Sequence, residues 1–254
     1  AADGSATARL TRGYDDRIRH RLVSLDPDHP REYDRSQPVH LSLYGDTTKI
    51  WGYGHLHPGG RVERLLWKKQ RLSGLDKAED ADVWMFIEQD YDDSPDIFVA
   101  GRPTLADARP VTRTNPQQAE YAWGWSELLD FTSENGDDLQ AALHYPANYD
   151  PTKTYPLIVY IYEMRSQGLR NYSVPSETRA YNFSVLNAEG YFVLQPDIVY
   201  RAQNPGLAAV ECVLPAVETA LDAMPAIDAD RIGLVGHSWG AYQTAFIVTQ
   251  TDRF

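Results

Sequence analysis

The stretch RIGLVGHSWGAYQTAF, residues 231–246, joins three patterns that decide the fold of its part of the chain. The apolar run IGLV predicts a buried strand, and AYQTAF predicts the start of a helix. Between them stands the motif Gly-x-Ser-x-Gly, from Gly236 to Gly240. A strand, a tight turn and a helix in this order are the setting in which a nucleophilic serine is displayed, so Ser238 is the candidate nucleophile.

The chemistry of such a turn accounts for its residues. Gly236 and Gly240 are expected where a Cβ atom would collide with the neighbouring strand and helix. Ser238 would stand at the N-terminus of a helix, whose dipole and free N–H groups favour the oxyanion formed when a carbonyl is attacked. The backbone N–H of Trp239 is the expected first donor to that oxyanion. The alternative is a glycine-rich strand-to-helix connection in a non-hydrolytic α/β domain.

Composition limits the classes of partner. The 254-residue chain has 24 Lys and Arg against 36 Asp and Glu, a formal net charge of −12. Such an acidic surface repels phosphate backbones and anionic lipids, so we expect neither nucleic acid nor a membrane as a partner. The single cysteine, Cys212, excludes an intrachain disulfide and a cysteine metal cluster. No apolar run is long enough for a transmembrane helix and the chain has no signal-peptide pattern, which predicts a soluble protein of unspecified compartment.

Residues 1–120 are predicted to be rich in β-strands. Short segments of alternating hydrophobicity are separated by Gly, Pro and Asp, and no stretch of useful length has a helical period. The pattern indicates antiparallel strands with one buried face, and by itself it leaves sandwich, barrel and propeller open. The predicted strands lie within residues 38–45, 61–70, 81–91 and 96–101.

Residues 121–254 change to a pattern in which strands alternate with helices. Residues 127–146 predict a β-hairpin around Gly136. Continuous apolar runs, typical of strands covered on both faces, occupy residues 155–162, 191–196 and 231–236. Residues 206–224 repeat apolar side chains every three or four positions, which predicts an amphipathic helix that Pro215 should kink or shorten. Strand, helix and strand in this order predict a right-handed crossover in an α/β sheet.

Several of these motifs resemble the prolyl oligopeptidase family of serine peptidases. GHSWGAY follows IDADRIGLVG within residues 227–242, and DFTSENGDDLQAALHYPANYDPTKTYPLIVYIYE occupies residues 130–163. The resemblance implies that residues 1–120 form the end of a β-propeller-like domain. It implies that residues 121–254 form the N-terminal part of an α/β-hydrolase catalytic domain. It also implies hydrolysis of a peptide substrate through an acyl-enzyme, as in the dipeptidyl peptidases and acylaminoacyl peptidases of this family.

The resemblance assigns roles to three residues. Ser238 corresponds to the nucleophile, and the Trp239 N–H to an oxyanion donor. Tyr162 ends the segment PLIVYIY, where members similar to dipeptidyl peptidases place a tyrosine whose hydroxyl completes the oxyanion hole. The alternative for Tyr162 is an aromatic side chain that fills space at a strand end. The chain departs from the family's usual residues at Ala241, expected to crowd the helix start, and in two substrate-site loops, residues 163–165 and 197–206.

A serine nucleophile needs a histidine base and a carboxylate, and in this fold both follow the serine along the chain. After Ser238 there is no histidine, and the one acid, Asp252, is expected at the far end of the helix. His237 is expected to turn into the packing, and His144 to be structural. The chain has seven histidines: His20, His29, His40, His55, His57, His144 and His237.

The pair His55 and His57 has a spacing that would suit a metal ion. Because no third ligand stands out in the sequence, a solvated strand end is the favoured interpretation. We therefore expect no bound metal and no cofactor.

Together these patterns predict a piece of a longer peptidase, with the rest of the catalytic domain beyond residue 254 and no triad catalysis by the piece itself. The opening residues AADGSATARL likewise indicate the middle of a longer chain. Two alternatives stay open: an esterase or acylaminoacyl hydrolase on the same fold, and a complete, non-catalytic β plus α/β binding module. In the second case an oligomer that shares strands would cover the apolar faces of an unfinished sheet.

Overall fold

The computed structural model describes residues 8–26, 28, 33–34 and 36–254, and the chain divides into two compact units. The first unit takes in the chain up to Asp90 together with Ser94–Thr114, and the second takes in Tyr91–Asp93 and Asn115–Phe254. Each unit has its own buried core. The domain boundary expected after residue 120 stays a prediction.

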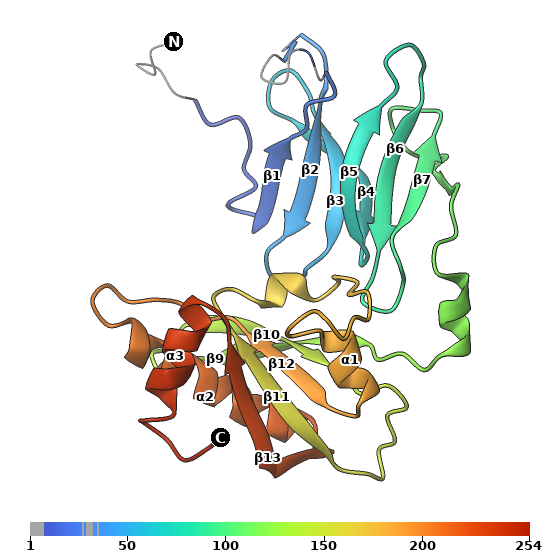
Figure 1. Ribbon diagram of the computed structural model, residues 1–254. Coiled ribbons are helices and arrows are strands. Elements are labelled where there is room, and N and C mark those ends of the chain that lie inside the picture. Colours follow the sequence, from blue (N-terminus) through green and yellow to red (C-terminus); the bar gives the residue numbers. More distant parts are fainter. Residues whose placement is uncertain (1–7, 27, 29–32, 35) are drawn as a thin grey trace. The chain divides into compact units, whose positions relative to one another are not determined.

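Over the residues that the structure describes, the first unit consists of two four-stranded antiparallel sheets (Figure 1), as the sequence predicts for an all-β region. One sheet contains β1 (Ile18–Leu22), β2 (Val39–Gly45), β3 (Trp51–Leu56) and β4 (Val62–Lys68) in that order. The other contains β5 (Arg71–Lys77), β6 (Trp84–Gln89), β7 (Asp96–Ala100) and β8 (Arg109–Pro110). Successive four-stranded antiparallel sheets are typical of β-propeller blades.

The four predicted strands of this region are confirmed as β2, β4, β6 and β7, whereas β1, β3, β5 and β8 were not predicted. In β3, two glycines interrupt the hydrophobic alternation. A Cβ on Gly52 would lie 2.2 Å from the carbonyl oxygen of Leu66 in the neighbouring strand, so close approach of the two backbones requires a glycine there. Gly52 thus interrupts the alternation from which β3 could have been predicted, and the same glycine allows β3 to pair with β4.

The second unit is built on a five-stranded mixed sheet in the order β13-β11-β12-β10-β9. Its strands are β9 (Ser126–Thr132), β10 (Asp138–His144), β11 (Tyr155–Ile161), β12 (Phe192–Pro196) and β13 (Ile227–Gly236). The hairpin β9–β10 is antiparallel, and β11 runs parallel to both β12 and β13. The predicted hairpin and the three predicted apolar strands are confirmed.

Three α-helices and two short 3₁₀ segments accompany this sheet (Figure 1). They are η1 (Pro116–Glu120), η2 (Ser166–Gly168), α1 (Phe183–Ala188), α2 (Pro205–Ala223) and α3 (Trp239–Ile247). The predicted amphipathic helix is confirmed as α2, whose small and branched side chains, among them Ala209, Val213 and Val217, are fully buried in the core. Helix α1 was not predicted because it has only six residues, too few to show a period. Its start is marked by Asn182, whose side chain accepts the Val185 N–H at 3.1 Å.

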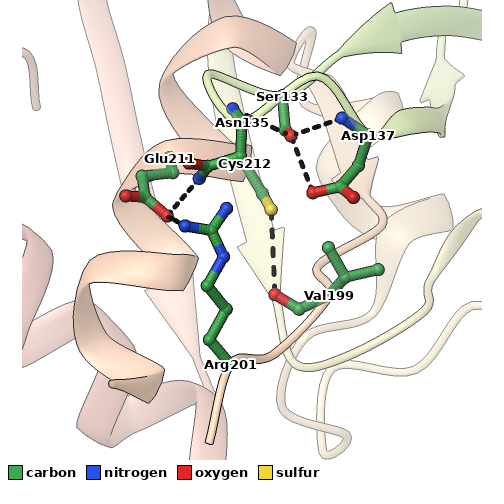
Figure 2. A network of polar contacts seen from close by, with 7 residues as sticks. All are labelled: Ser133, Asn135, Asp137, Val199, Arg201, Glu211 and Cys212. Atoms are coloured by element: carbon green, nitrogen blue, oxygen red, sulfur yellow. Dashed lines mark hydrogen bonds and ion pairs between the residues drawn. The ribbon is translucent and has the colours of Figure 1, made fainter.

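Helix α2 continues through Pro215 because the backbone carbonyl that loses its helical hydrogen bond to the proline accepts another one from outside the helix. Proline has no N–H, so the carbonyl of Glu211, four residues earlier, loses its helical partner. That carbonyl accepts the backbone N–H of Glu134, in the β9–β10 turn, at 2.9 Å. The Glu211 carboxylate also accepts a hydrogen bond from the Asn135 side chain and lies 3.4 Å from Arg201 Nη1 (Figure 2). The proline site therefore docks the hairpin turn onto the helix.

Among the described residues, no helix combines the length and the apolar character that a bilayer span requires.

Candidate active site

The Gly-x-Ser-x-Gly motif, from Gly236 to Gly240, forms a sharp turn between β13 and α3. Strand β13 ends at Gly236, and α3 begins at Trp239. Ser238 lies between them with φ 52° and ψ −114°. Its side chain is exposed and makes no capping hydrogen bond to the helix. A non-glycine residue at positive φ stores backbone strain, a feature of turns that lift a nucleophile clear of a sheet.

The two glycines of the motif sit where backbones approach each other most closely. A Cβ on Gly236 would lie 2.2 Å from the carbonyl oxygen of Gly240. A Cβ on Gly240 would lie 2.2 Å from the carbonyl oxygen of Ile161, the last residue of β11. A Cβ atom cannot lie 2.2 Å from a carbonyl oxygen, so any larger residue at either glycine would force the turn away from the sheet.

Tyr162 follows β11 directly and therefore lies beside this turn. The parallel register pairs Ile161 of β11 with Gly236 of β13. The Cα of Tyr162 would be 3.4 Å from a Cβ built on Gly240. Tyr162 is partly buried, whereas Trp239 is 37% exposed, and its ring stacks on Tyr242 at a centroid distance of 4.9 Å. The fold thus brings the three predicted site residues, Tyr162, Ser238 and Trp239, to one edge of the sheet.

Two residues that the sequence did not single out hold this edge together. The hydroxyl of Tyr200 donates to the backbone carbonyl of Tyr162 and accepts a hydrogen bond from Gln243 Nε2 at 3.1 Å. Gln243 is fully buried on α3, and burial raises the pKa of the Tyr200 hydroxyl. Tyr200 lies in the loop 197–206, where the sequence departs from the usual residues of the family that it resembles. No sequence pattern indicated a role for this residue. It links the end of β11 to the helix that carries the serine turn.

The divergent loop after Tyr162 is also anchored. Arg165 Nη2 donates to Gln195 Oε1 at 3.0 Å. The buried carboxylate of Asp197 accepts the backbone N–H of Ser166 at 2.7 Å and its hydroxyl at 2.5 Å. The loop therefore has a defined path beside the candidate site.

Ala241 is exposed at the start of α3, so its methyl group points to solvent and does not crowd the helix start as the sequence analysis expected.

His237 occupies a different position from the one predicted. Its side chain is exposed and lies 6.2 Å, between ring centroids, from Tyr181, whereas the sequence analysis expected it to turn into the packing. The reason is that β13 ends at Gly236, so His237 already belongs to the turn above the sheet. Asp252 is exposed and lies past the end of α3, as expected. Within the described part of the chain, no hydrogen bond joins a histidine or a carboxylate to the Ser238 hydroxyl.

His144 is a buried component of the sheet, as predicted. It is 1% exposed at the end of β10, and its ring lies against Tyr91 and Phe183. Its Nε2 accepts the Gln195 side-chain amide at 2.7 Å. Burial, with a smaller contribution from Arg165, lowers the pKa of His144 to about 3, so the ring is neutral at pH 7.

This burial predicts a specific loss of stability in acid. Because the folded-state pKa of His144 is depressed below its unfolded value of about 6.5, the unfolded chain binds the proton more readily, and stability falls as pH drops below 6.5. From pH 7 to pH 5 we expect a decrease of about 2 kcal/mol in the free energy of unfolding from this residue. Urea unfolding of the wild type and of His144→Gln at both pH values measures this decrease. The free energy of unfolding of the variant should fall by about 2 kcal/mol less than that of the wild type. Equal losses in both proteins would contradict the assignment.

The strain at Ser238 predicts that removing its Cβ stabilises the chain. We expect Ser238→Gly to raise the free energy of unfolding by about 1 kcal/mol, because glycine adopts positive φ without steric conflict. Ser238→Ala keeps the Cβ and is the matched control, with no such gain. Chemical denaturation of the three proteins tests this, and a Ser238→Gly variant no more stable than Ser238→Ala would show that the turn is unstrained.

The structure supplies the third ligand that the sequence lacked beside His55 and His57. Glu63, on β4, places Oε2 at 2.6 Å from His57 Nε2. The candidate ligand atoms of His55, His57 and Glu63 lie within 4.8 Å of one another. The strand end thus has a third candidate ligand, and the expectation that no metal binds there stays a prediction. His20 and His40 lie in the same unit, and His29 lies outside the described residues.

Comparison with known proteins finds similarity to peptidases. No protein family profile matches it. An uncharacterized peptidase of Bacillus subtilis (strain 168), YuxL, is 30% identical over 146 residues, which are 53% of this chain and 21% of that protein. The chain thus spans about a fifth of the length of this curated relative.

Solved structures of two peptidases share the fold. The acylaminoacyl peptidase of Pyrococcus horikoshii matches with a TM-score of 0.64 and 18% identity, over 85% of this chain and 34% of that one. Dipeptidyl peptidase 4 of Porphyromonas gingivalis matches with a TM-score of 0.65 and 19% identity, over 84% of this chain and 32% of that one. The resemblance predicted from the serine motif and its upstream segments is confirmed: this chain resembles a part of the peptidases of the prolyl oligopeptidase family.

Proposed function

We propose that this chain is part of a serine peptidase that hydrolyses peptide bonds through an acyl-enzyme on Ser238. The observation that carries the proposal is the strained, exposed serine between two glycines, at the point where β13 turns into α3. The φ of 52° and ψ of −114° at Ser238 lie outside the left-handed helical region, and strained turns of this kind hold a nucleophile clear of a sheet.

In the proposed reaction the Ser238 Oγ attacks the carbonyl carbon of the scissile bond and gives its proton to a histidine base. The tetrahedral oxyanion accepts hydrogen bonds from the Trp239 N–H, at the start of α3, and from the Tyr162 hydroxyl. The histidine then protonates the leaving amine, and the C–N bond breaks. Water, deprotonated by the same base, attacks the ester and releases the acid and the free serine.

Tyr200 serves as a positioning residue in this scheme. Its hydroxyl ties the Tyr162 backbone to Gln243 of α3, so the element that carries the tyrosine and the helix that follows the serine move as one. Pre-organisation of this kind is what allows oxyanion donors to act without reorganising during the reaction.

The domain assignment belongs to the same proposal. Residues 121–254 form the N-terminal part of an α/β-hydrolase domain, and residues 1–120 form the end of a β-propeller. Parallel strands β11, β12 and β13, with the serine turn at the carboxyl end of β13, support the first assignment. The two four-stranded sheets support the second.

The proposal places the triad histidine and its carboxylate outside residues 1–254. Of the histidines in the second unit, His144 is buried and bound to Gln195, and His237 sits in the serine turn itself without a hydrogen bond to Ser238. Asp252 lies beyond the far end of α3. Residues 1–254 alone should therefore show no appreciable triad catalysis.

A second candidate is an esterase or acylaminoacyl hydrolase with the same nucleophile, favoured by the structural similarity to an acylaminoacyl peptidase. The longer protein that contains this chain should be assayed on peptidyl p-nitroanilides, on N-acylated peptides and on p-nitrophenyl esters. The peptidase proposal predicts comparable or higher kcat/KM for the amide substrates. Turnover of esters without any amide substrate would replace it by the esterase. No turnover of either class, with Ser238 unlabelled by a fluorophosphonate, would favour a non-catalytic binding module.

A further inference from the structure

Three adjacent strands of the first unit carry metal-binding side chains in one row. The register places His40 of β2 opposite His55 of β3, and His55 opposite Glu63 of β4. Residues directly opposite each other on neighbouring strands point to the same face, with Cβ atoms about 5 Å apart. His57, two residues after His55, continues on that face. Four potential ligands therefore gather on one side of the sheet.

The candidate ligand atoms of these residues lie close together. His57 Nε2 lies 2.6 Å from Glu63 Oε2, and His40 Nε2 lies 3.0 Å from His55 Nε2. The ligand atoms of His55, His57 and Glu63 all lie within 4.8 Å of one another. In a tetrahedral zinc site, metal–nitrogen bonds of about 2.0–2.1 Å put neighbouring ligands about 3.4 Å apart. The His57–Glu63 and His40–His55 pairs are closer than this separation, so these side chains would move slightly apart around an ion.

The surroundings give the cluster both support and access. His55 shares its face with Tyr53, which is 2% exposed in the core, so the strand that carries the ligands is held firmly. A cleft of about 800 Å³, lined by residues that include Leu56 and His57, opens beside it. Arg61 lies 3.5 Å from Glu63, but its side chain is 66% exposed and has room to turn to solvent.

We propose that His55, His57 and Glu63, with His40 as the fourth ligand, bind a divalent first-row transition metal ion that clamps β2, β3 and β4 together. Imidazole nitrogens with one carboxylate suit Zn²⁺, Cu²⁺ and Ni²⁺, and disfavour Mg²⁺ and Ca²⁺, which prefer oxygen ligands. The site is structural and independent of the chemistry at Ser238. The competing explanation is a hydrogen-bonded group of histidines that binds no ion.

The test is titration of the chelator-treated 254-residue chain with Zn²⁺ by calorimetry, followed by the visible spectrum after substitution with Co²⁺. The proposal predicts saturable binding of one ion, a rise in melting temperature, and the intense absorption bands of tetrahedral Co²⁺. His57→Gln and Glu63→Gln should each weaken Zn²⁺ affinity on the order of 100-fold, since each removes a direct ligand. Absence of saturable binding, or only the weak spectrum of octahedral Co²⁺, would overturn it.

His20→Gln is the matched control. Its position opposite Leu43 places it on the other face of the same sheet, away from the cluster. We expect this variant to bind Zn²⁺ as the wild type does. If His20→Gln weakened binding as much as His57→Gln, the ion would be held by unspecific histidine contacts and the site would be rejected. Circular dichroism without metal shows whether each variant is folded. If a variant is unfolded, the Co²⁺ spectrum of the wild type still shows whether the site binds a metal ion tetrahedrally.

Discussion

Replacing Ser238 by alanine should abolish the proposed peptidase activity of the protein that contains this chain while leaving its fold intact. We expect kcat to fall about 10⁴-fold or more, because without the Oγ no acyl-enzyme forms and only the oxyanion donors and binding contacts remain. The KM should change little, since the exposed hydroxyl makes no contact that holds the site together. Initial rates on an amide substrate, measured for the wild type and Ser238→Ala, give both values.

A serine in a surface loop of the same unit provides the control. The hydroxyl of Ser176 lies 3.1 Å from that of Thr178, far along the chain from the nucleophile turn. Ser176→Ala should keep wild-type kcat. The free energy of unfolding of Ser238→Ala should stay within about 0.5 kcal/mol of the wild type, so that lost activity cannot be ascribed to unfolding. Retention of activity by Ser238→Ala would reject the serine as nucleophile.

Gly240→Ala should strongly destabilise the chain at the site. The added methyl carbon would meet the carbonyl oxygen of Ile161 at 2.2 Å and its carbonyl carbon at 3.1 Å. Both are backbone atoms of β11, which cannot rotate aside as a side chain would, so helix and strand must separate. We expect a loss of about 3 kcal/mol in the free energy of unfolding, measured by urea denaturation. Activity should fall as well, because Tyr162 follows Ile161 directly.

Gly168→Ala makes the same chemical change where there is space. Its Cβ would meet Asn171 Nδ2 at 3.5 Å, an ordinary contact, so we expect a change within about 0.5 kcal/mol. Equal stabilities of the Gly240→Ala and Gly168→Ala proteins would show that β11 and the serine turn do not approach each other as described.

The features of the fold and of the candidate site that could be predicted from the sequence are those formed by residues close together in the chain. The serine turn and the strand before it were predictable because the motif and the apolar run are contiguous. Helix α2 was predictable because its apolar side chains repeat at helical spacing over a long stretch. The six-residue helix α1 and the glycine-interrupted strand β3 were not, because neither shows a period.

Features that depend on register could not be predicted at all. Glu63 meets His55 only through the pairing of β3 with β4, which contains an irregularity between Tyr53 and Gly54 that no sequence pattern announces. Tyr200 reaches the Tyr162 carbonyl across 38 residues of chain. The orientation of His237 followed from the residue at which β13 ends, and strand ends are the least predictable part of any element.

Ser238 is proposed to be a nucleophile that its turn holds clear of the sheet. The most direct measurement is to react the longer protein with a fluorophosphonate probe and to map the labelled residue by mass spectrometry of its peptides. We expect a single adduct on the peptide that contains Ser238, and none in Ser238→Ala. A label on another serine, or hydrolysis of amide substrates by a protein whose Ser238 stays unmodified, would contradict it.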